Sequence, residues 1–235
     1  VVASGDDGVA MMYILIFLVM LWTGGVSWIW FALGAGAAVI GLPIVWNLSI
    51  AGHTLVSDYQ KQRILMVFDP SIDPQATGIR WHTNQSLLTL TGGGVTGQGL
   101  FSGTRTQAGA LSQQHTDFIF SVIGEELGIV GCTFVLLLLA VIVARCIYVG
   151  VKSGSYMNRQ VCIGMAGMLI WQIIINVGMC VGLTPVIGLT LPFISYGGSS
   201  ILTMFAAMGI VSGIHMRPAP DSSAHYIRPP YDNAG

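Results

Sequence analysis

Residues Gly8–Gly52 read GVAMMYILIFLVMLWTGGVSWIWFALGAGAAVIGLPIVWNLSIAG, a stretch without a single charged side chain. A helix needs about 20 apolar residues to cross the hydrocarbon core of a bilayer, so the stretch is long enough for two membrane spans. The pair Gly24-Gly25 is typical of the turn between them. The stretch therefore predicts an integral membrane protein whose first two spans lie at about residues 9–25 and 27–50.

The composition of the whole chain supports lipid as its solvent. Charged residues make up 8% and hydrophobic residues 53% of the 235 positions, whereas soluble proteins average about 25% charged residues. A net charge of −1 without a basic block argues against nucleic-acid binding. The four cysteines lie in or beside apolar runs without a CxxC pair, so they are interpreted as packing residues. The acidic start after Val1 does not resemble a signal peptide, and we expect a truncated N-terminus.

The rest of the chain alternates between polar and apolar segments. Residues 53–116 carry charges among many Gly, Ser, Thr and Gln residues and predict a long extracellular loop. Pro185, Pro192 and Gly197-Gly198 interrupt the uncharged stretch that precedes Arg217, which suits an irregular segment at membrane depth. The complete prediction is an all-α membrane domain at 1–217 with further spans at about 118–144, 161–183 and 199–215, a re-entrant loop at 184–199, and a disordered cytoplasmic tail at 218–235.

The distribution of lysine and arginine predicts the orientation in the membrane. Short positively charged loops face the cytoplasm in bacterial membrane proteins. The basic positions fall at two places separated by two spans: Arg145, Lys152 and Arg159, then Arg217 and Arg228. Both places are therefore expected in the cytoplasm, and the loops 53–116 and 184–199 are expected to share the outer face.

Asp117 lies where the extracellular loop meets the third span. One hypothesis is a helix cap, since Asp or Thr accepts hydrogen bonds from the free amides of a first helical turn. The other is a general base beside a substrate at the membrane surface. The two compete, because a helix N-terminus lowers the pKa of a carboxylate while desolvation raises it.

Two further features have both a functional and a structural interpretation. Glu125 and Glu126 fall inside the third span, where a carboxylate needs a cavity or a partner; a bond to a neighbouring helix is at least as plausible as a functional role. The glycine run from Gly92 to Gly103 allows close backbone approach, either of a ligand phosphate or in a mobile turn. The cations of the outer loop suit a diphosphate leaving group, although lone loop cations are more often solvated: Lys61, Arg63, Arg80 and Arg105.

Several motifs together resemble one known family. His115-Thr116-Asp117-Phe118-Ile119-Phe120, followed by Gly124-Glu125-Glu126-Leu127-Gly128, is similar to the HTDFIF…GEELG signature of the SEDS (FtsW/RodA/SpoVE) family. The stretch from Pro185 to Ser200 resembles its second diagnostic loop. Asp58-Tyr59-Gln60-Lys61-Gln62-Arg63-Ile64 and Asn84-Gln85-Ser86 add supporting matches. The matches cover nearly the whole chain in the right order.

The resemblance implies a ten-helix membrane fold, of which this chain supplies helices six to ten. It implies a peptidoglycan glycosyltransferase that polymerises lipid II with inversion during cell division or elongation, and we expect the fragment alone to be inactive. Its expected partners are lipid II, the undecaprenyl-linked glycan and a class B penicillin-binding protein, in the bacterial cytoplasmic membrane. Asp117 is the expected catalytic residue. The expected substrate-binding residues are His115, Thr116, Gln85, Ser86, Arg63, Lys61, Ser195, Tyr196, Gly197, Gly198 and Ser199.

A divalent cation, Mg²⁺ or Mn²⁺, suits the diphosphate, although the sequence shows no ligand set for it. A lipid II flippase is the first alternative, but a transporter places its decisive charges near the bilayer midplane and Asp117 lies at the edge. A non-catalytic scaffold for a transpeptidase is the second, and it would tolerate replacement of Asp117.

Overall fold

A computed structural model of the protein describes residues 7–47, 49–50, 53–54, 61–63, 65, 79–111 and 113–217. Helices dominate, and a two-residue antiparallel hairpin of β1 (Ser49–Ile50) and β2 (His53–Thr54) is the one sheet in this part of the chain. The predicted all-α class is confirmed. The helices are α1 (Asp7–Thr23), α2 (Trp28–Asn47), α4 (Ile79–Gly92), α5 (Thr104–Gln107), α6 (Ile119–Lys152), α7 (Tyr156–Cys180) and α8 (Gly198–Met216).

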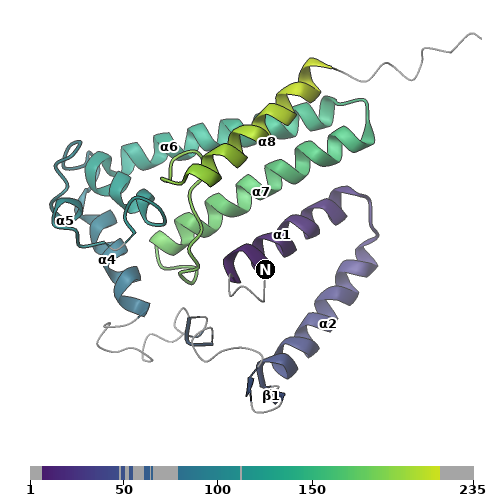
Figure 1. The fold of residues 1–235 in the computed structure, drawn as a ribbon, viewed down its shortest axis with the longest axis horizontal. Coiled ribbons are helices and arrows are strands. Elements are labelled where there is room, and N and C mark those ends of the chain that lie inside the picture. Colours follow the sequence, from purple (N-terminus) through teal and green to yellow (C-terminus); the bar gives the residue numbers. More distant parts are fainter. Residues whose placement is uncertain are drawn as a thin grey trace, which may run out of the picture.

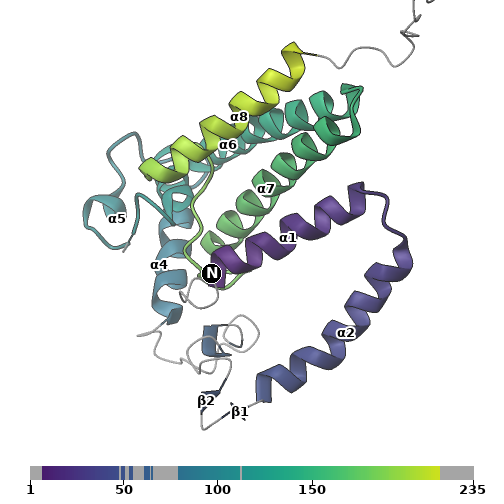
Figure 2. The same cartoon turned by 45° about the vertical axis from the view of Figure 1, so that its right-hand side comes forward.

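The centre of the fold is the antiparallel pair α6 and α7 (Figure 1). Helix α1 packs along α7, α8 contacts both α6 and α7, and α4 packs against the first part of α6. Helix α2 runs away from this bundle in both views (Figure 1, Figure 2). The bundle therefore has one end built from α4, α5 and the start of α6, which is the end that carries Asp117.

Three helices are long and apolar enough to cross a membrane within the described residues: α6, α7 and α8. The first two predicted spans correspond to shorter apolar stretches, Gly8–Thr23 and Trp28–Gly41. The helix bounds differ from the predicted spans, because α6 continues to Lys152 and α7 already begins at Tyr156. The predicted disordered tail at 218–235 lies outside the described residues.

The segment predicted as one extracellular loop contains two helices, α4 and α5, where the sequence analysis expected none. Helix α4 has few apolar residues at helical spacing, and it forms because its buried face packs on α6 and α7. Ser86 and Thr89 are its fully buried residues. The Ser86 hydroxyl lies 2.6 Å from that of Ser121 on α6 and donates to the Cys180 carbonyl at the end of α7 over 3.0 Å.

Helix α6 bends at Gly128, which has a non-helical backbone (φ 68°, ψ −167°). Its 34 residues would reach about 51 Å as a straight helix, well beyond the roughly 30 Å hydrocarbon core. The bend leaves backbone groups without helical partners, and the glycine run supplies them. Gln98 and Gly99 donate to the carbonyls of Glu125 and Glu126, while the carbonyls of Gly94 and Val95 accept from Ile129 and Val130.

This docking explains the glycines themselves. A Cβ at Gly93 would overlap the Gly124 carbonyl, and a Cβ at Gly97 would overlap the Glu126 carbonyl. Close backbone approach was predicted, but the partner in the structure is the bent part of α6, so the expectation that the run admits a ligand phosphate is wrong for Gly93 and Gly97. Four backbone hydrogen bonds join the segment to α6.

Apolar packing holds the site-bearing end together. One buried cluster lies below Asp117 and joins the loop after α7 to α6 through Phe118, Phe120, Cys180 and Leu191. A second cluster joins α1 to the same loop through Met12, Met179 and Leu189. The four cysteines are buried and free, as the interpretation as packing residues predicted.

Candidate functional site

Asp117 lies in the turn that leads into α6, immediately before the first helical residues. The N-cap of α6 is Phe118, and no side chain caps the helix. The hypothesis that Asp117 is a helix cap is therefore wrong. Phe118 is 2% exposed and packs in the apolar core, which anchors the backbone beside Asp117.

Three consecutive carbonyls of the His115–Asp117 segment accept hydrogen bonds from other parts of the fold. The Tyr196 amide donates to the His115 carbonyl over 2.9 Å. The Ser195 hydroxyl donates to the Thr116 carbonyl over 2.6 Å and accepts from the Leu191 amide over 2.7 Å. The structure thus joins the two diagnostic motifs of the sequence directly.

The third carbonyl, that of Asp117, accepts from a side chain inside the bundle. Nδ2 of Asn176 on α7 lies 2.9 Å from it and also donates to the Leu189 carbonyl over 2.6 Å. Asn176 is fully buried. A single amide group therefore holds the Asp117 backbone and the loop after α7 at the same point.

Backbone strain occurs in both of the joined segments. Gln113 (φ 58°) and Phe193 (φ 63°) are non-glycine residues in the left-handed region, which costs about 1–3 kcal/mol each when the residue has a Cβ and is usually tolerated at functional sites. The Gln113 carbonyl accepts from the amides of Thr116 and Asp117. The strain is thus part of the turn that presents Asp117.

The Asp117 carboxyl is half-buried. Burial raises its pKa above the ordinary value, and a hydrogen bond from the Thr116 side chain opposes part of that increase. Gly188 lies beside the carboxylate with φ 70°, and a Cβ there would come within 3.6 Å of Oδ2. Glycine therefore both permits the backbone turn and leaves this side of the carboxylate open.

Glu125 has the opposite environment, although it is close in sequence to Asp117. It is fully buried, and its carboxylate accepts from the Arg105 amide over 2.8 Å, the Thr106 amide over 2.9 Å and the Thr106 hydroxyl over 2.5 Å. The two amides belong to the first turn of α5 and have no partner within that helix. Glu125 therefore holds α5 onto α6. This agrees with the structural role considered for Glu125 in the sequence analysis, and its partners lie within this chain.

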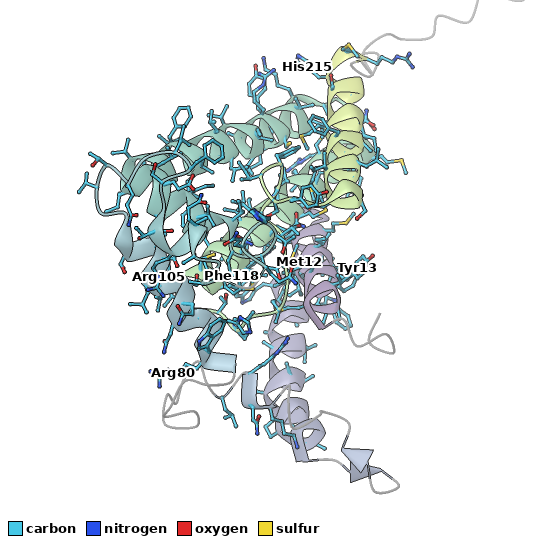
Figure 3. All side chains as sticks on the ribbon, turned by 60° about the vertical axis from the view of Figure 1, so that its left-hand side comes forward. Met12, Tyr13, Arg80, Arg105, Phe118 and His215 are labelled. Carbon is cyan, nitrogen blue, oxygen red and sulfur yellow. The ribbon has the colours of Figure 1, made fainter. Side chains whose placement is uncertain are left out.

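Arg105 is one of the predicted cations, and its side chain has two contacts on α4. Nε lies 3.3 Å from the Thr89 hydroxyl, and a terminal nitrogen donates to the Gln85 side-chain oxygen. Arg105 is half-buried and lies toward the same end of the bundle as Phe118, whereas His215 marks the opposite end (Figure 3). The fixed backbone of α5 and the two contacts on α4 orient this guanidinium.

The remaining predicted substrate-binding residues fall into three groups. Fully or largely buried are Ser86, which joins α4 to α6 and α7, and Ser195 at 2% exposure. Half-buried are Thr116, Gln85, Lys61, Arg63 and Gly197. Exposed are His115, Tyr196, Gly198 and Ser199. The hydrogen bonds bring together His115, Thr116, Asp117, Ser195 and Tyr196, while Gln85 pairs with Arg105 instead.

A divalent cation needs several acidic, histidine or cysteine side chains close together. Among the described residues, no three His, Cys, Asp or Glu side chains gather in one place. Glu125 has its carboxylate occupied by α5. The residues described do not offer a ligand set for a divalent cation, and no chemical step below is assigned to one.

Asn176 is the site residue that sequence reasoning missed. The signal was present, because an amide side chain in the middle of an uncharged membrane helix is expensive unless it has a specific partner. The partners were not predictable from the sequence, since both are backbone carbonyls in distant segments.

The fold and site define a polytopic membrane helix bundle that presents a half-buried carboxylate at one end. Comparison with known proteins places it more narrowly: the family model described as cell cycle protein, FtsW/RodA/SpoVE, matches residues 1–219. The chain belongs to this family.

Relatives with known names support the same family assignment. The chain is 35% identical over 215 residues to the peptidoglycan glycosyltransferase MrdB of Escherichia coli K12, covering 92% of this chain and 56% of the relative. It is 37% identical over 213 residues to the probable peptidoglycan glycosyltransferase FtsW of Geobacter sulfurreducens, covering 90% and 54%. The chain thus spans about half the length of these relatives.

A solved structure is also similar. This structure is described as the structural coordination of polymerization and crosslinking by a peptidoglycan synthase complex. One of its chains matches this protein with a TM-score of 0.73 and 30% sequence identity. The match covers 92% of this chain and 57% of that one. The arrangement of helices described above is therefore that of a SEDS protein.

Proposed function

We propose that the full-length protein is a peptidoglycan glycosyltransferase that polymerises lipid II, with Asp117 as its general base. The observation that carries the proposal is the way Asp117 is held: three consecutive carbonyls are bonded to the rest of the fold, while the carboxylate remains half-buried at the end of the bundle. The relatives named peptidoglycan glycosyltransferases support it.

The reaction needs one proton acceptor and stabilisation of one leaving group. The 4-hydroxyl of one lipid-linked disaccharide attacks the anomeric carbon of the growing strand. A new C–O bond forms, the bond to the diphosphate breaks with inversion, and the hydroxyl proton passes to the Asp117 carboxylate. Burial raises the pKa of this carboxyl, which makes its ionised form a better base than an exposed aspartate.

The departing undecaprenyl diphosphate needs positive charge. We assign Arg105 to this role among the predicted cations, because its backbone is fixed by Glu125 and its side chain by Thr89 and Gln85. Arginine suits a diphosphate, since its planar guanidinium binds phosphate oxygens in a bidentate manner. Lys61 and Arg63 remain candidates for the same charge.

The proposed orientation in the membrane follows from the distribution of lysine and arginine. The end with Asp117 and α5 faces outward, and the end with Arg145, Lys152 and His215 faces the cytoplasm. A class B penicillin-binding protein is the proposed partner. Support comes from the similar solved structure, whose complex couples polymerization to crosslinking.

The deciding experiment measures polymerisation of lipid II by the full-length protein in liposomes, with the transpeptidase site of its partner blocked. Wild type is compared with Asp117→Asn, which keeps the shape of the side chain and removes the base. Polymer from the wild type and a loss of about 10²–10⁴-fold in the variant are expected, the usual contribution of a general base. Equal polymer from both would remove Asp117 from the mechanism.

A lipid II flippase is the second candidate. The carboxylate of Glu125 is bonded to α5, which leaves Glu126 as the buried carboxylate of α6 that a flippase would use. Transfer of a fluorescent lipid II across vesicles without polymer formation would favour the flippase.

A further inference from the structure

We infer that Asn176 is a positioning residue for the polymerisation reaction, acting through the backbone of Asp117. The inference rests on the proposed function. One Nδ2 group donates to the Asp117 carbonyl over 2.9 Å and to the Leu189 carbonyl over 2.6 Å. It thereby fixes the carboxylate-bearing residue relative to the loop that carries Ser195 and Gly188.

Asn176 brings both a cost and a benefit to the interior of the bundle. Asn176 is fully buried, and its Oδ1 has no hydrogen-bond partner in the structure. A buried polar group without a partner costs free energy, of the order of 1–3 kcal/mol. An apolar side chain would avoid that cost on Oδ1, but it would leave two carbonyls without their donor.

The consequence for catalysis follows from geometry. The Asp117 carbonyl is two bonds from the Cα that bears the catalytic side chain, so movement of the carbonyl moves the carboxylate. A displacement of about 1 Å at a reacting group costs on the order of 10²-fold in rate. We call the two hydrogen bonds of Asn176 to the carbonyls of Asp117 and Leu189 the clamp. A further hydrogen bond supports it at the neighbouring residue, where the Ser195 hydroxyl donates to the Thr116 carbonyl over 2.6 Å.

The clamp also keeps the Asp117 carboxyl in its half-buried position. If the segment moves toward water, the desolvation that raises the pKa of Asp117 is reduced. The acidic limb of the pH–rate profile then moves to lower pH. The nearby titratable side chains are His115, which is exposed, and Cys180, whose Sγ lies 3.9 Å from the Asp117 carbonyl. Both are retained in every variant below.

The test uses the full-length protein with its partner, reconstituted in liposomes. Asn176→Leu removes both donors at similar volume, and Ser195→Ala removes the neighbouring donor with a smaller change. The matched control is Thr184→Val, which deletes a 3.0 Å hydrogen bond to the carbonyl of Ile175, the residue next to Asn176 on α7. Polymer formation is measured as kcat and KM for lipid II across pH, normalised to folded protein.

For Asn176→Leu we expect kcat to fall about 10–100-fold with KM changed less than threefold, and the acidic limb to move to lower pH. Ser195→Ala should show the same pattern at smaller amplitude, and Thr184→Val should retain the wild-type profile. A purely structural role lowers the amount of folded enzyme without moving the acidic limb. That result in both Asn176→Leu and Ser195→Ala, or an equal loss in Thr184→Val, overturns the inference.

The same experiment separates this inference from the proposed function. A wild type that makes polymer together with an unaltered Asn176→Leu variant overturns the positioning role alone. A wild type that makes no polymer with its partner present overturns both, because there is then no polymerisation for Asn176 to support.

Discussion

Asp117 lies just before α6 and Glu125 lies within it, and the fold uses these two acidic residues in opposite ways. At Asp117 the backbone carbonyls are bonded to distant segments and the carboxylate is left half-buried. At Glu125 the carboxylate itself is the bonded group, with two amides and two hydroxyls as its donors. A carboxylate that has no free lone pair to offer is a poor base. The two residues thus differ in which of their groups is bonded: the backbone carbonyls at Asp117, and the carboxylate itself at Glu125.

Replacing Asp117 by Asn should give the largest functional effect with the smallest structural one. Catalysis falls by about 10²–10⁴-fold, or about 3–5 kcal/mol in the barrier. The melting temperature at neutral pH should stay equal or rise. Burial raises the pKa of this carboxyl, so its contribution to stability is greatest when protonated and declines as the pH rises through the folded pKa. Asn stays neutral and avoids that decline.

The stability part is checked by thermal unfolding in detergent at pH 5 and pH 8. The advantage of the Asn variant over wild type should be larger at pH 8. A variant that melts well below wild type at both pH values would contradict the assignment of Asp117 as a strained functional group.

The same pKa direction predicts the pH dependence of the wild-type enzyme. The base is active when ionised, so kcat/KM falls as the pH drops through the pKa of Asp117, which burial places above its ordinary value. The acidic limb is measured with lipid II in liposomes from about pH 3 to about pH 8. A limb at or below the ordinary aspartate pKa of about 3.9 would show that the reacting carboxylate is fully solvated.

Glu125→Gln should reverse the pattern of Asp117→Asn. The substitution places an amide among donors and removes the charge that strengthens their bonds, so stability should fall by about 2–4 kcal/mol. Activity per folded molecule should fall less than tenfold. Chemical unfolding and the polymerisation assay on the same preparation check both parts, with Glu126→Gln as the control on the same helix. A loss of activity as large as that of Asp117→Asn, with unchanged stability, would make Glu125 the catalytic carboxylate.

The sequence predicted the fold class better than the contacts that build the candidate site. Charge-free stretches indicated the helices, and the boundary position of Asp117 indicated a functional carboxylate. Both interpretations rest on local residue patterns. The clamp through Asn176 and the docking of Gly93 and Gly97 on α6 involve backbone groups distant in sequence, which no residue pattern specifies. Helix α4 was missed for a related reason, since tertiary packing rather than an apolar repeat holds it.

Gly93→Ala tests the Glu125 side of the comparison without altering a charge. The added Cβ would overlap the Gly124 carbonyl and lie 2.7 Å from the Glu125 carbonyl. Because the neighbours are backbone atoms of α6, they cannot rotate away, and we expect a loss of about 1–3 kcal/mol. Gly94→Ala is the spatial control, since a Cβ there meets nothing within 4 Å, although its positive φ of 57° carries its own cost. Equal stability of Gly93→Ala and wild type would show that the glycine run does not stay docked on α6.

Ser86→Ala should have the smallest effect and separates helix packing from substrate binding. Ser86 is fully buried and bonded to Ser121 and the Cys180 carbonyl, so its loss should cost about 1 kcal/mol of stability, the usual net value of a buried hydrogen bond. KM for lipid II should remain within twofold of wild type, because substrate does not reach a side chain enclosed by α4, α6 and α7. Thermal unfolding and the polymerisation assay measure the two quantities. A several-fold rise in KM at unchanged stability would return Ser86 to the substrate-binding set and place the substrate channel between α4 and α7, deeper than the Asp117 turn.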